Sequence, residues 1–205
     1  MGKLESLVKA YALELGFEVV GITTAEPFLR DERAALDRIR KGFMDGLPWY
    51  TEDRVRRANS PRLLLNGARS VVSLASSYLT GEAQAGAGGP AGKVARYAWG
   101  DDYHDVLKAR LREFTDGLPD RVGKEVRTRT FVDDGPMNDR AAARRAGVGW
   151  FGKSTNILTP SHGSWVFLGQ VITDLELQPD PPLKKSCGTC VRCIDDCPTG
   201  AIVAP

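Results

Sequence analysis

Hydrophobic residues along this chain switch repeatedly between the spacing of a helix and the spacing of a strand. Near the start, apolar side chains recur every three or four residues from Leu4 to Leu15, and Gly16 follows, which predicts an amphipathic helix with a glycine C-cap. Similar patterns predict helices over residues 30–43, 102–114 and 138–146, and strands over residues 17–22, 71–75, 94–98, 126–132 and 165–173. This order predicts an α+β fold, a mixed α/β core in which helices pack on a β-sheet.

Two stretches interrupt the periodic pattern. Residues 81–92 are rich in glycine and alanine without periodicity, which predicts a surface loop. Pro179, Pro181 and Pro182 mark a linker near the end of the chain. We therefore expect one domain over residues 1–178 and a separate segment over residues 179–205.

The composition is that of an ordinary soluble protein, with 42% hydrophobic and 26% charged residues. No apolar run approaches the roughly 20 residues that a membrane-spanning helix needs. We therefore expect a cytoplasmic protein in a reducing compartment.

Basic residues gather in three places although the net charge is only +2. One cluster holds Arg54, Arg56, Arg57 and Arg62, a second runs over residues 121–129, and a third comprises Arg140, Arg144 and Arg145. Such clusters usually form solvent-exposed faces of the protein. The more specific alternative is a binding surface for the phosphate backbone of a nucleic acid.

The only four cysteines of the chain stand close together near its end. Cys187, Cys190, Cys193 and Cys197 form the run C-x2-C-x2-C-x3-C-P. This is the spacing of bacterial ferredoxins, in which the fourth cysteine ligates a different 4Fe–4S cluster from the first three. Zinc sites usually separate two C-x2-C pairs by a longer spacer, and no signal peptide is recognisable that would favour disulfides. We therefore predict a short ferredoxin-like tail that binds iron–sulfur clusters.

Two adjacent carboxylates, Asp133 and Asp134, end the strand predicted over residues 126–132 and precede a Gly-Pro turn. Loops at strand ends are where α/β folds often display catalytic groups. The alternative is that one of the two aspartates caps the following helix. Composition alone leaves both possibilities open.

Residues 147–156 hold three glycines and a Lys-Ser pair, which match the count of a phosphate-binding loop. Such a loop requires a strand before it and a helix after it. Here the glycines follow a predicted helix, and the residues after them disfavour another one. We therefore reject a nucleotide hydrolase and retain a glycine-rich loop whose backbone approaches a large polar ligand.

Residues 95–104 place three aromatic side chains, Arg96 and His104 within ten positions. Asp101 or Asp102 is expected to cap the helix that starts here. A surface histidine without further function is the commoner outcome for His104 at a helix start.

These stretches, in this order, resemble the epoxyqueuosine reductase family. The matching pieces are R-Y-A-W-G-x-D-Y-H at residues 96–104, V-D at 132–133, D-R-A-x-A-x-R-A-G-x-G-W-x-G-K at 139–153, G-S-W-x-F-L-G at 163–169, and the cysteine run with its tail P-T-G-A-I. The resemblance covers nearly the whole chain.

The resemblance implies an oxidoreductase that converts epoxyqueuosine to queuosine in tRNA with cobalamin and two 4Fe–4S clusters. The aspartate of the V-D pair, which maps to Asp133, is then the acid that protonates the departing oxygen. Implied partners are tRNA and an electron donor such as a flavodoxin or ferredoxin, with no membrane and a monomeric state. Implied cofactor-binding residues are Arg57, Arg96, Tyr97, His104, Asp133, Gly152, Lys153 and Ser154, and implied metal ligands are the four cysteines.

Members of this family continue beyond the first cysteine run with a second one, whereas this sequence ends eight residues after Cys197. We therefore expect an incomplete ligand set and no turnover by this chain alone. Three alternatives remain open: a corrinoid-binding module without reductase activity, a small iron–sulfur electron-transfer protein, and a dehalogenase-type reductase with a small organic substrate.

Overall fold

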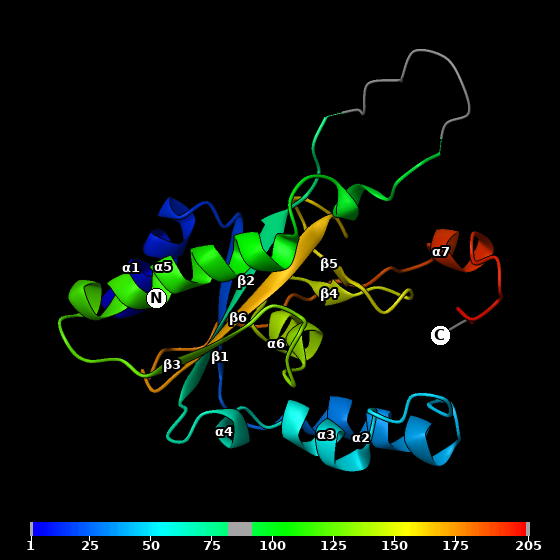
Figure 1. Ribbon diagram of the computed structural model, residues 1–205, viewed down its shortest axis with the longest axis horizontal. Helices are drawn as coiled ribbons and strands as arrows, with labels where there is room; N and C mark the ends of the chain where they lie inside the picture. Colours follow the sequence, from blue (N-terminus) through cyan, green and yellow to red (C-terminus); the bar gives the residue numbers. More distant parts are fainter. Residues whose placement is uncertain (1, 82–91, 204–205) are drawn as a thin grey trace.

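The computed structural model describes residues 2–81 and 92–203, and its centre is an antiparallel four-stranded sheet (Figure 1). The strand order is β1-β2-β6-β3, with β1 at Val19–Thr24, β2 at Ser70–Ser77, β6 at Val166–Thr173 and β3 at Thr128–Phe131. A separate hairpin pairs β4 (Trp150–Phe151) with β5 (Ile157–Leu158). The helices are α1 (Lys3–Glu14), α2 (Leu29–Arg40), α3 (Glu52–Ala58), α4 (Pro61–Leu64), the 3₁₀ turn η1 (Arg96–Ala98), α5 (Tyr103–Val122), α6 (Asp139–Arg145) and α7 (Arg192–Asp195).

Helices cover both faces of this sheet, because successive side chains of its central strands point to opposite sides. On one face, Val72 and Leu74 of β2 pack against α1 and α5 in a core that includes Leu111 and Phe114. On the other face, Val71 belongs to a second core with side chains of α6. Figure 1 shows α1 and α5 above the sheet and α6 below it. Strand β2 is therefore almost completely buried, and β6 is buried from Gly169 to Thr173.

The close fit of α6 against β1 depends on one glycine. A Cβ at Gly21 would collide with the carbonyl oxygen of Ala146, directly after α6. Glycine thus allows the end of this helix to approach the strand backbone.

Helices α2, α3 and α4 form a layer at the bottom of Figure 1, on the α6 side of the sheet. Arg145 at the end of α6 ties the start of this layer to the body. Its guanidinium donates to Thr23 Oγ1 at 2.8 Å, to the carbonyl oxygens of Thr24 and Glu26 at 2.7 and 2.8 Å, and to that of Pro27 at 3.2 Å. The guanidinium also lies 4.0 Å from the centroid of the Phe28 ring. One half-buried cation therefore holds the segment that leads from β1 into α2.

The segment after β6 stays attached to the body for several residues. Leu175 and Leu177 are buried in the core. Asp180 forms a two-point contact with the edge strand β1, in which Ile22 N donates to Asp180 Oδ2 and Asp180 N donates to Ile22 O, both at 2.8 Å. The division at residue 178 stays a prediction, and the cysteine-containing segment with α7 follows these contacts. None of the helices in the described residues is long and apolar enough to cross a bilayer.

The predicted α+β fold is confirmed, and most predicted elements lie within a few residues of their observed bounds. The strand predicted over residues 94–98 is wrong, because three of these residues form η1. The helix predicted over 102–114 continues to Val122 and contains Pro119 in its last turn. The predicted loop at 81–92 falls almost entirely on residues 82–91, outside the described part.

Candidate active site

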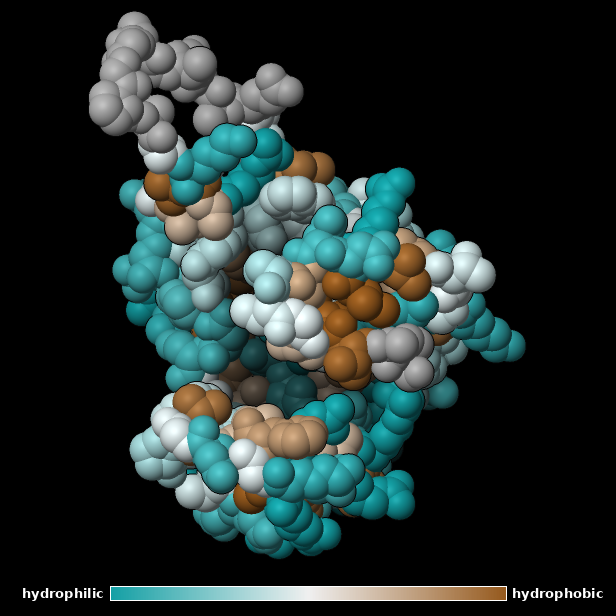
Figure 2. All heavy atoms as spheres, turned by 90° about the vertical axis from the view of Figure 1, so that its right-hand side faces the viewer, coloured by the Kyte–Doolittle hydropathy of each residue, from teal (hydrophilic) through white to brown (hydrophobic). Residues whose placement is uncertain are grey.

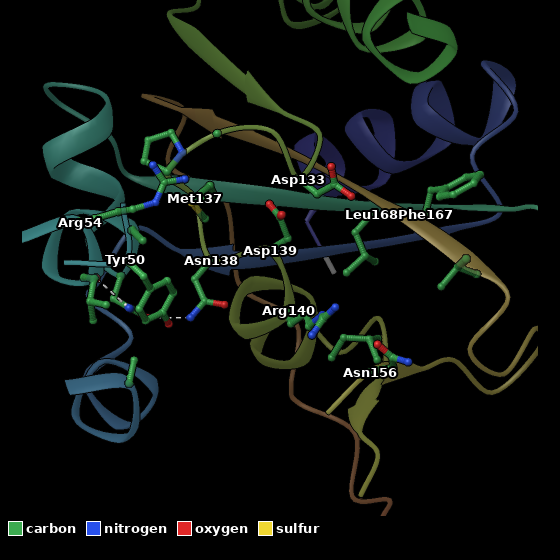
Figure 3. A pocket seen from close by; sticks show the side chains of 18 of the residues that line it. Tyr50, Arg54, Asp133, Met137, Asn138, Asp139, Arg140, Asn156, Phe167 and Leu168 are labelled. Atoms are coloured by element: carbon green, nitrogen blue, oxygen red, sulfur yellow. Dashed lines mark hydrogen bonds between the residues drawn. The ribbon is translucent and has the colours of Figure 1, made fainter. Parts of the chain in front are cut away.

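An open cavity of about 660 Å³ lies between the α2–α3 layer and the body of the molecule. Figure 2 shows it as a recess with hydrophilic side chains deep inside. Its wall combines aromatic and apolar side chains with amides, carboxylates and two arginines: Trp49, Tyr50, Arg54, Asn59, Tyr78, Tyr97, Tyr103, Asp133, Met137, Asn138, Asp139, Arg140, Asn156, Val166, Phe167 and Leu168. Figure 3 shows that these side chains come from several elements, including β6, the β3–α6 loop and the β4–β5 hairpin.

Asp133 enters this cavity from a strained turn directly after β3. Its φ of 40° lies in the left-handed region, which residues other than glycine rarely adopt. Asp134 N donates to Val132 O at 2.5 Å across the turn, in the rare γ-turn geometry with positive φ at the central residue. Such a conformation costs about 1–3 kcal/mol and persists only where its surroundings enforce it. The strain directs one particular carboxylate into the pocket.

Two side chains from the start of α5 hold the Asp133 carboxylate. Tyr103 Oη donates to Oδ2 at 2.7 Å, and His104 Nε2 lies 2.7 Å from Oδ1. The other ring nitrogen of His104, Nδ1, lies 2.8 Å from Asp102 Oδ1. Asp102 also caps α5, because the same oxygen accepts from His104 N at 2.9 Å. The helix start therefore places His104 between two carboxylates.

The electrostatics of this group favour a charged histidine. Burial lowers the pKa of His104, but the hydrogen bonds to Asp102 and Asp133 outweigh it, so that this pKa is raised above its ordinary value of 6.5. Burial, together with the hydrogen bond to Asp133, raises the pKa of Tyr103, which therefore keeps its proton and acts as a donor. An imidazolium that donates to Asp133 is a proton source within reach of this carboxylate.

Aromatic rings form a platform beside Asp133. The Tyr103 ring stacks on Phe167 of β6 with centroids 4.1 Å apart and an interplanar angle of 2°. Tyr78 lies on the same Phe167 ring at 4.6 Å. A broad apolar surface thus borders the Asp133 carboxylate.

The neighbouring Asp134 points to a different partner. It forms an ion pair with Lys108 of α5, and the hydrogen bond from this lysine lowers the pKa of Asp134. Neither aspartate caps α6, because the Asn138 side chain accepts from Ala141 N at 3.2 Å. The structure therefore excludes the capping alternative and places Asp133 in the cavity lining, while a catalytic role for Asp133 stays a prediction.

Asp139, the first residue of α6, is a second carboxyl group in the cavity. Its Oδ1 is buried and has no hydrogen-bond partner among the described residues. Burial, with the negative charge of Asp133 as the next contribution, raises the pKa of Asp139 to about 7. In the sequence, Asp139 stands out only as the first residue of a motif at residues 139–153.

The predicted ligand residues Gly152, Lys153 and Ser154 form the turn of the β4–β5 hairpin. Gly152 N donates to Asn156 O at 2.8 Å, and Thr155 N donates to Gly152 O at 2.9 Å. A strand follows this turn instead of a helix, which confirms the rejection of a phosphate-binding loop. Of this hairpin, Asn156 and Ile157 line the cavity, while the three predicted residues do not.

Of the other predicted ligand residues, some line the cavity and others lie outside it. Tyr97 lines the cavity and is 53% exposed. Arg96 lies outside the lining, where its Nη1 donates to Thr80 O at 3.1 Å and its guanidinium lies over the Trp99 and Trp165 rings. Arg57 is exposed on α3, and Arg54 of the same helix lines the cavity in its place.

Most of the basic clusters take part in contacts within the molecule. Arg56 pairs with Glu52, and Arg62 pairs with Glu26. In the second and third clusters, ion pairs or carbonyl contacts engage Arg121, Arg127, Arg129 and Arg145. These contacts account for many of the arginines without a phosphate ligand.

The four cysteines are free thiols in the segment around α7, and Cys190 is the most exposed of them. Within residues 2–81 and 92–203, no three His, Cys, Asp or Glu side chains lie close enough together to hold a metal ion. Hydrogen bonds from the backbone of Ile202 and from Thr199 lower the pKa of Cys197 to about 7. The cysteines as metal ligands stay a prediction.

Sequence reasoning missed Arg54, Tyr103, Asp139, Arg140 and Asn156 as pocket residues. Tyr103 had a signal, because it precedes His104 at a helix start that is rich in aromatic residues. For Asp139 and Asn156 the sequence carries no local signal, since their roles depend on how α6 and the hairpin fold against β6.

Comparisons with known proteins agree with this arrangement. The family described as "Epoxyqueuosine reductase QueG, DUF1730" matches residues 57–134, which include Tyr103, His104 and Asp133. An epoxyqueuosine reductase from Cellulophaga algicola is 42% identical over 203 residues, which cover 99% of this chain and 65% of that protein. The chain thus spans somewhat less than two thirds of this relative.

Solved structures show the same fold. An epoxyqueuosine reductase crystallised with an epoxyqueuosine-modified tRNA-Tyr stem-loop has a TM-score of 0.89 and 35% identity, and the match covers 99% of this chain and 54% of that one. A reductive dehalogenase described as B12-dependent shares the fold alone, with a TM-score of 0.50 and 20% identity over 86% of this chain and 20% of that one. This chain is thus similar to epoxyqueuosine reductases over nearly its whole length.

Proposed function

We propose that this chain carries the site that reduces epoxyqueuosine to queuosine in tRNA. The observation that carries the proposal is the strained Asp133 carboxylate, held in an open cavity by Tyr103 and His104. The related structure with a modified tRNA stem-loop supports the choice of substrate.

Asp133 is the proton donor in this proposal. Opening an epoxide leaves negative charge on its oxygen, and a positioned acid neutralises that charge as it forms. His104 shares a hydrogen bond with Asp133 and can supply the proton to it. Tyr103 fixes the other carboxylate oxygen, so that the acid keeps one orientation.

The cavity suits cobalamin, which presents a broad ring edged with amide side chains. Phe167, Leu168 and Tyr103 offer a flat apolar wall, while Asn156, Tyr97 and Arg140 offer polar groups for the amides. These residues would hold the cofactor, with the Gly152–Ser154 turn as backbone support. Bound cobalamin would supply electrons to the epoxide carbon.

Cys187, Cys190, Cys193 and Cys197 would bind iron–sulfur clusters that carry single electrons toward the cavity. Their spacing supports this role, and the lowered pKa of Cys197 favours the thiolate that metals bind. The electron donor would be a low-potential protein such as a flavodoxin or ferredoxin.

The tRNA would approach over the α2–α3 layer in this proposal. Trp49 is 55% exposed at the cavity wall, and the Arg54 guanidinium lies 5.0 Å from its ring centroid. Exposed aromatic rings and arginines stack on unpaired bases.

Cobalamin binding is the first testable consequence. We expect anaerobic titration with cob(II)alamin to saturate and to change the cobalt EPR signal. Asn156→Trp should lower the affinity at least about tenfold, because the indole fills part of the cavity, whereas Lys124→Trp at the exposed end of α5 should not. No binding by the wild-type chain, or equal binding by the Asn156→Trp variant, would reject this cavity as the cofactor site.

A further inference from the structure

Asp139 is a half-buried residue of the cavity wall, and the proposed role of Asp133 leaves its carboxyl group unexplained. Figure 3 shows the Asp139 side chain rising from the start of α6 toward the side of the pocket that holds Asp133. Its Oδ1 is enclosed and lacks a hydrogen-bond partner among the described residues. A buried ionised carboxylate without a partner is costly, so this group is stable chiefly when it holds a proton.

The charges near Asp139 act in both directions on its pKa, and the negative ones reinforce the effect of burial. Asp133 and Asp134 are both negative and precede it in the β3–α6 loop, while Arg140 follows it with a positive charge. Lys108 neutralises Asp134, and His104 contacts Asp133. Burial and the two aspartates outweigh Arg140 and raise the pKa of Asp139 to about 7. Across the cavity, Arg54 of α3 adds a further positive charge.

Asp139 is also firmly placed. Asn138 caps α6, and the fully buried Gln170 of β6 donates from Nε2 to the Asp139 carbonyl oxygen at 3.4 Å. The first residue of the helix is thus attached to the centre of the sheet, so that its carboxyl stays at the cavity.

The reaction needs more protons than the His104–Asp133 pair supplies, because His104 can pass only one proton to Asp133. Converting an epoxide to an alkene releases the oxygen as water, which consumes two electrons and two protons. One proton opens the ring to a hydroxyl group, and a second lets the hydroxyl group leave as water. A low-potential one-electron donor of the iron–sulfur class supplies the two electrons in turn.

We propose that Asp139 stores the second proton and transfers it to Asp133 after the first protonation. In this step the O–H bond of Asp139 breaks and an O–H bond forms on Asp133, directly or through one water molecule. The Asp139 carboxylate then regains a proton from solvent through the open cavity. Asp139 is therefore a positioning residue that acts through Asp133, and this inference rests on the proposed function.

The first test needs no substrate and no cofactor. Carboxyl carbons of ¹³C-labelled aspartates are followed by NMR from pH 4 to pH 9 in the wild-type chain and in the Asp139→Asn variant. We expect one aspartate to titrate near pH 7, and its signal to be missing from the variant. The proposal is overturned if no aspartate titrates above about pH 6, or if the titrating signal remains in the Asp139→Asn variant.

The second test measures single turnover of an epoxyqueuosine stem-loop with cobalamin and a chemical reductant. We expect Asp139→Asn to lower the single-turnover rate constant roughly 100-fold, at the lower end of what a positioned acid contributes, with the RNA concentration for half-maximal rate unchanged. The wild-type rate should fall as the pH rises through about 7. Asp139→Asn should lose this fall near pH 7 and keep only the loss of rate that follows deprotonation of His104, and Asp139→Glu should regain it at a shifted pH.

A purely structural role predicts a different pattern. Asp139→Asn would then keep the wild-type pH profile, or Asp139→Glu would lose as much activity as Asp139→Asn, and either result overturns the proposal. Failure of the proposed function is distinguishable, because the wild-type chain would then bind or convert nothing while the NMR titration still reports whether Asp139 holds a proton.

Discussion

At the scale of single residues, the site depends on one strained aspartate and the two side chains that hold it. The left-handed backbone at Asp133 is unfavourable by itself, and hydrogen bonds from Tyr103 and His104 offset its cost. The same two hydrogen bonds aim the carboxylate and connect it to a proton source. The two hydrogen bonds that stabilise the strained backbone of Asp133 are therefore the same ones that orient its carboxylate.

The histidine contact predicts a pH-dependent contribution to stability. Because the pKa of His104 is higher in the folded state than its ordinary value of 6.5, the folded state binds the proton more tightly. The contribution is complete below pH 6.5 and disappears as pH rises through the folded-state pKa. We expect His104→Gln to destabilise the protein more at pH 5.5 than at pH 9, as measured by urea unfolding.

Asp102→Asn provides the matched variant for that experiment. Asparagine also caps helices, so α5 keeps its cap while one of the two carboxylates at His104 loses its charge. The stability of this variant should depend less on pH than that of the wild type. A destabilisation by His104→Gln that is equal at both pH values would contradict the charged-histidine account.

Sequence reasoning identified Asp133 and His104 separately but not their contact. The two residues are 29 positions apart, and only the antiparallel arrangement of α5 against β3 brings them together. From the residues alone, His104 was expected to be a surface histidine without further function. Its contacts with two carboxylates differ from that expectation.

At the scale of elements, Arg145 shows how a basic cluster can serve the fold. The sequence placed Arg145 in a cluster with Arg140 and Arg144, for which a solvated face and a phosphate footprint were the alternatives. The structure instead buries its guanidinium against the β1–α2 connection, and this burial lowers the pKa of Arg145 to about 10. Nothing in the charge pattern distinguishes such an arginine from an exposed one.

Removing this guanidinium should loosen the α2–α3 layer. We expect Arg145→Met to lower the free energy of unfolding by about 2–3 kcal/mol, because several carbonyl groups lose their donor. Arg145→Lys should recover little, since an ammonium cannot reproduce the planar fork. Arg144→Met on the same helix is the control, with a loss below about 1 kcal/mol, because Arg144 lies over the Phe151 ring at 5.9 Å. Equal losses in denaturant unfolding for Arg144→Met and Arg145→Met would contradict this account.

The elements themselves were largely predictable where hydrophobic periodicity is strong. Strands β2 and β6 and helices α1 and α6 follow their apolar patterns closely. No helix was predicted where α3 lies, because Val55 is its only buried side chain and a seven-residue helix shows too little periodicity. The strands β4 and β5 could not be predicted either, because two residues are too few to show an alternating pattern.

At the scale of the whole molecule, the cavity exists because two layers meet on the α6 side of the sheet (Figures 1 and 2). Its lining residues come from widely separated parts of the sequence, so no local motif outlines it. The resemblance to a known family supplied the chemistry, while the structure supplied the partners of Asp133 and the second carboxyl group. The chain covers 54% of a solved relative, and the proposed clusters depend on ligands beyond its own four cysteines.

Reduction of an epoxyqueuosine-containing tRNA stem-loop tests the central claim most directly. The chain is loaded anaerobically with cobalamin and mixed with this RNA, and a chemical reductant of low potential supplies the electrons in place of the incomplete iron–sulfur segment. The nucleosides are then analysed by mass spectrometry. We expect the wild type to form queuosine, Asp133→Asn to be at least about 100-fold slower, and Asp134→Asn to stay close to the wild type. Absence of queuosine despite bound cobalamin, or an Asp133→Asn rate equal to that of the wild type, would contradict the account.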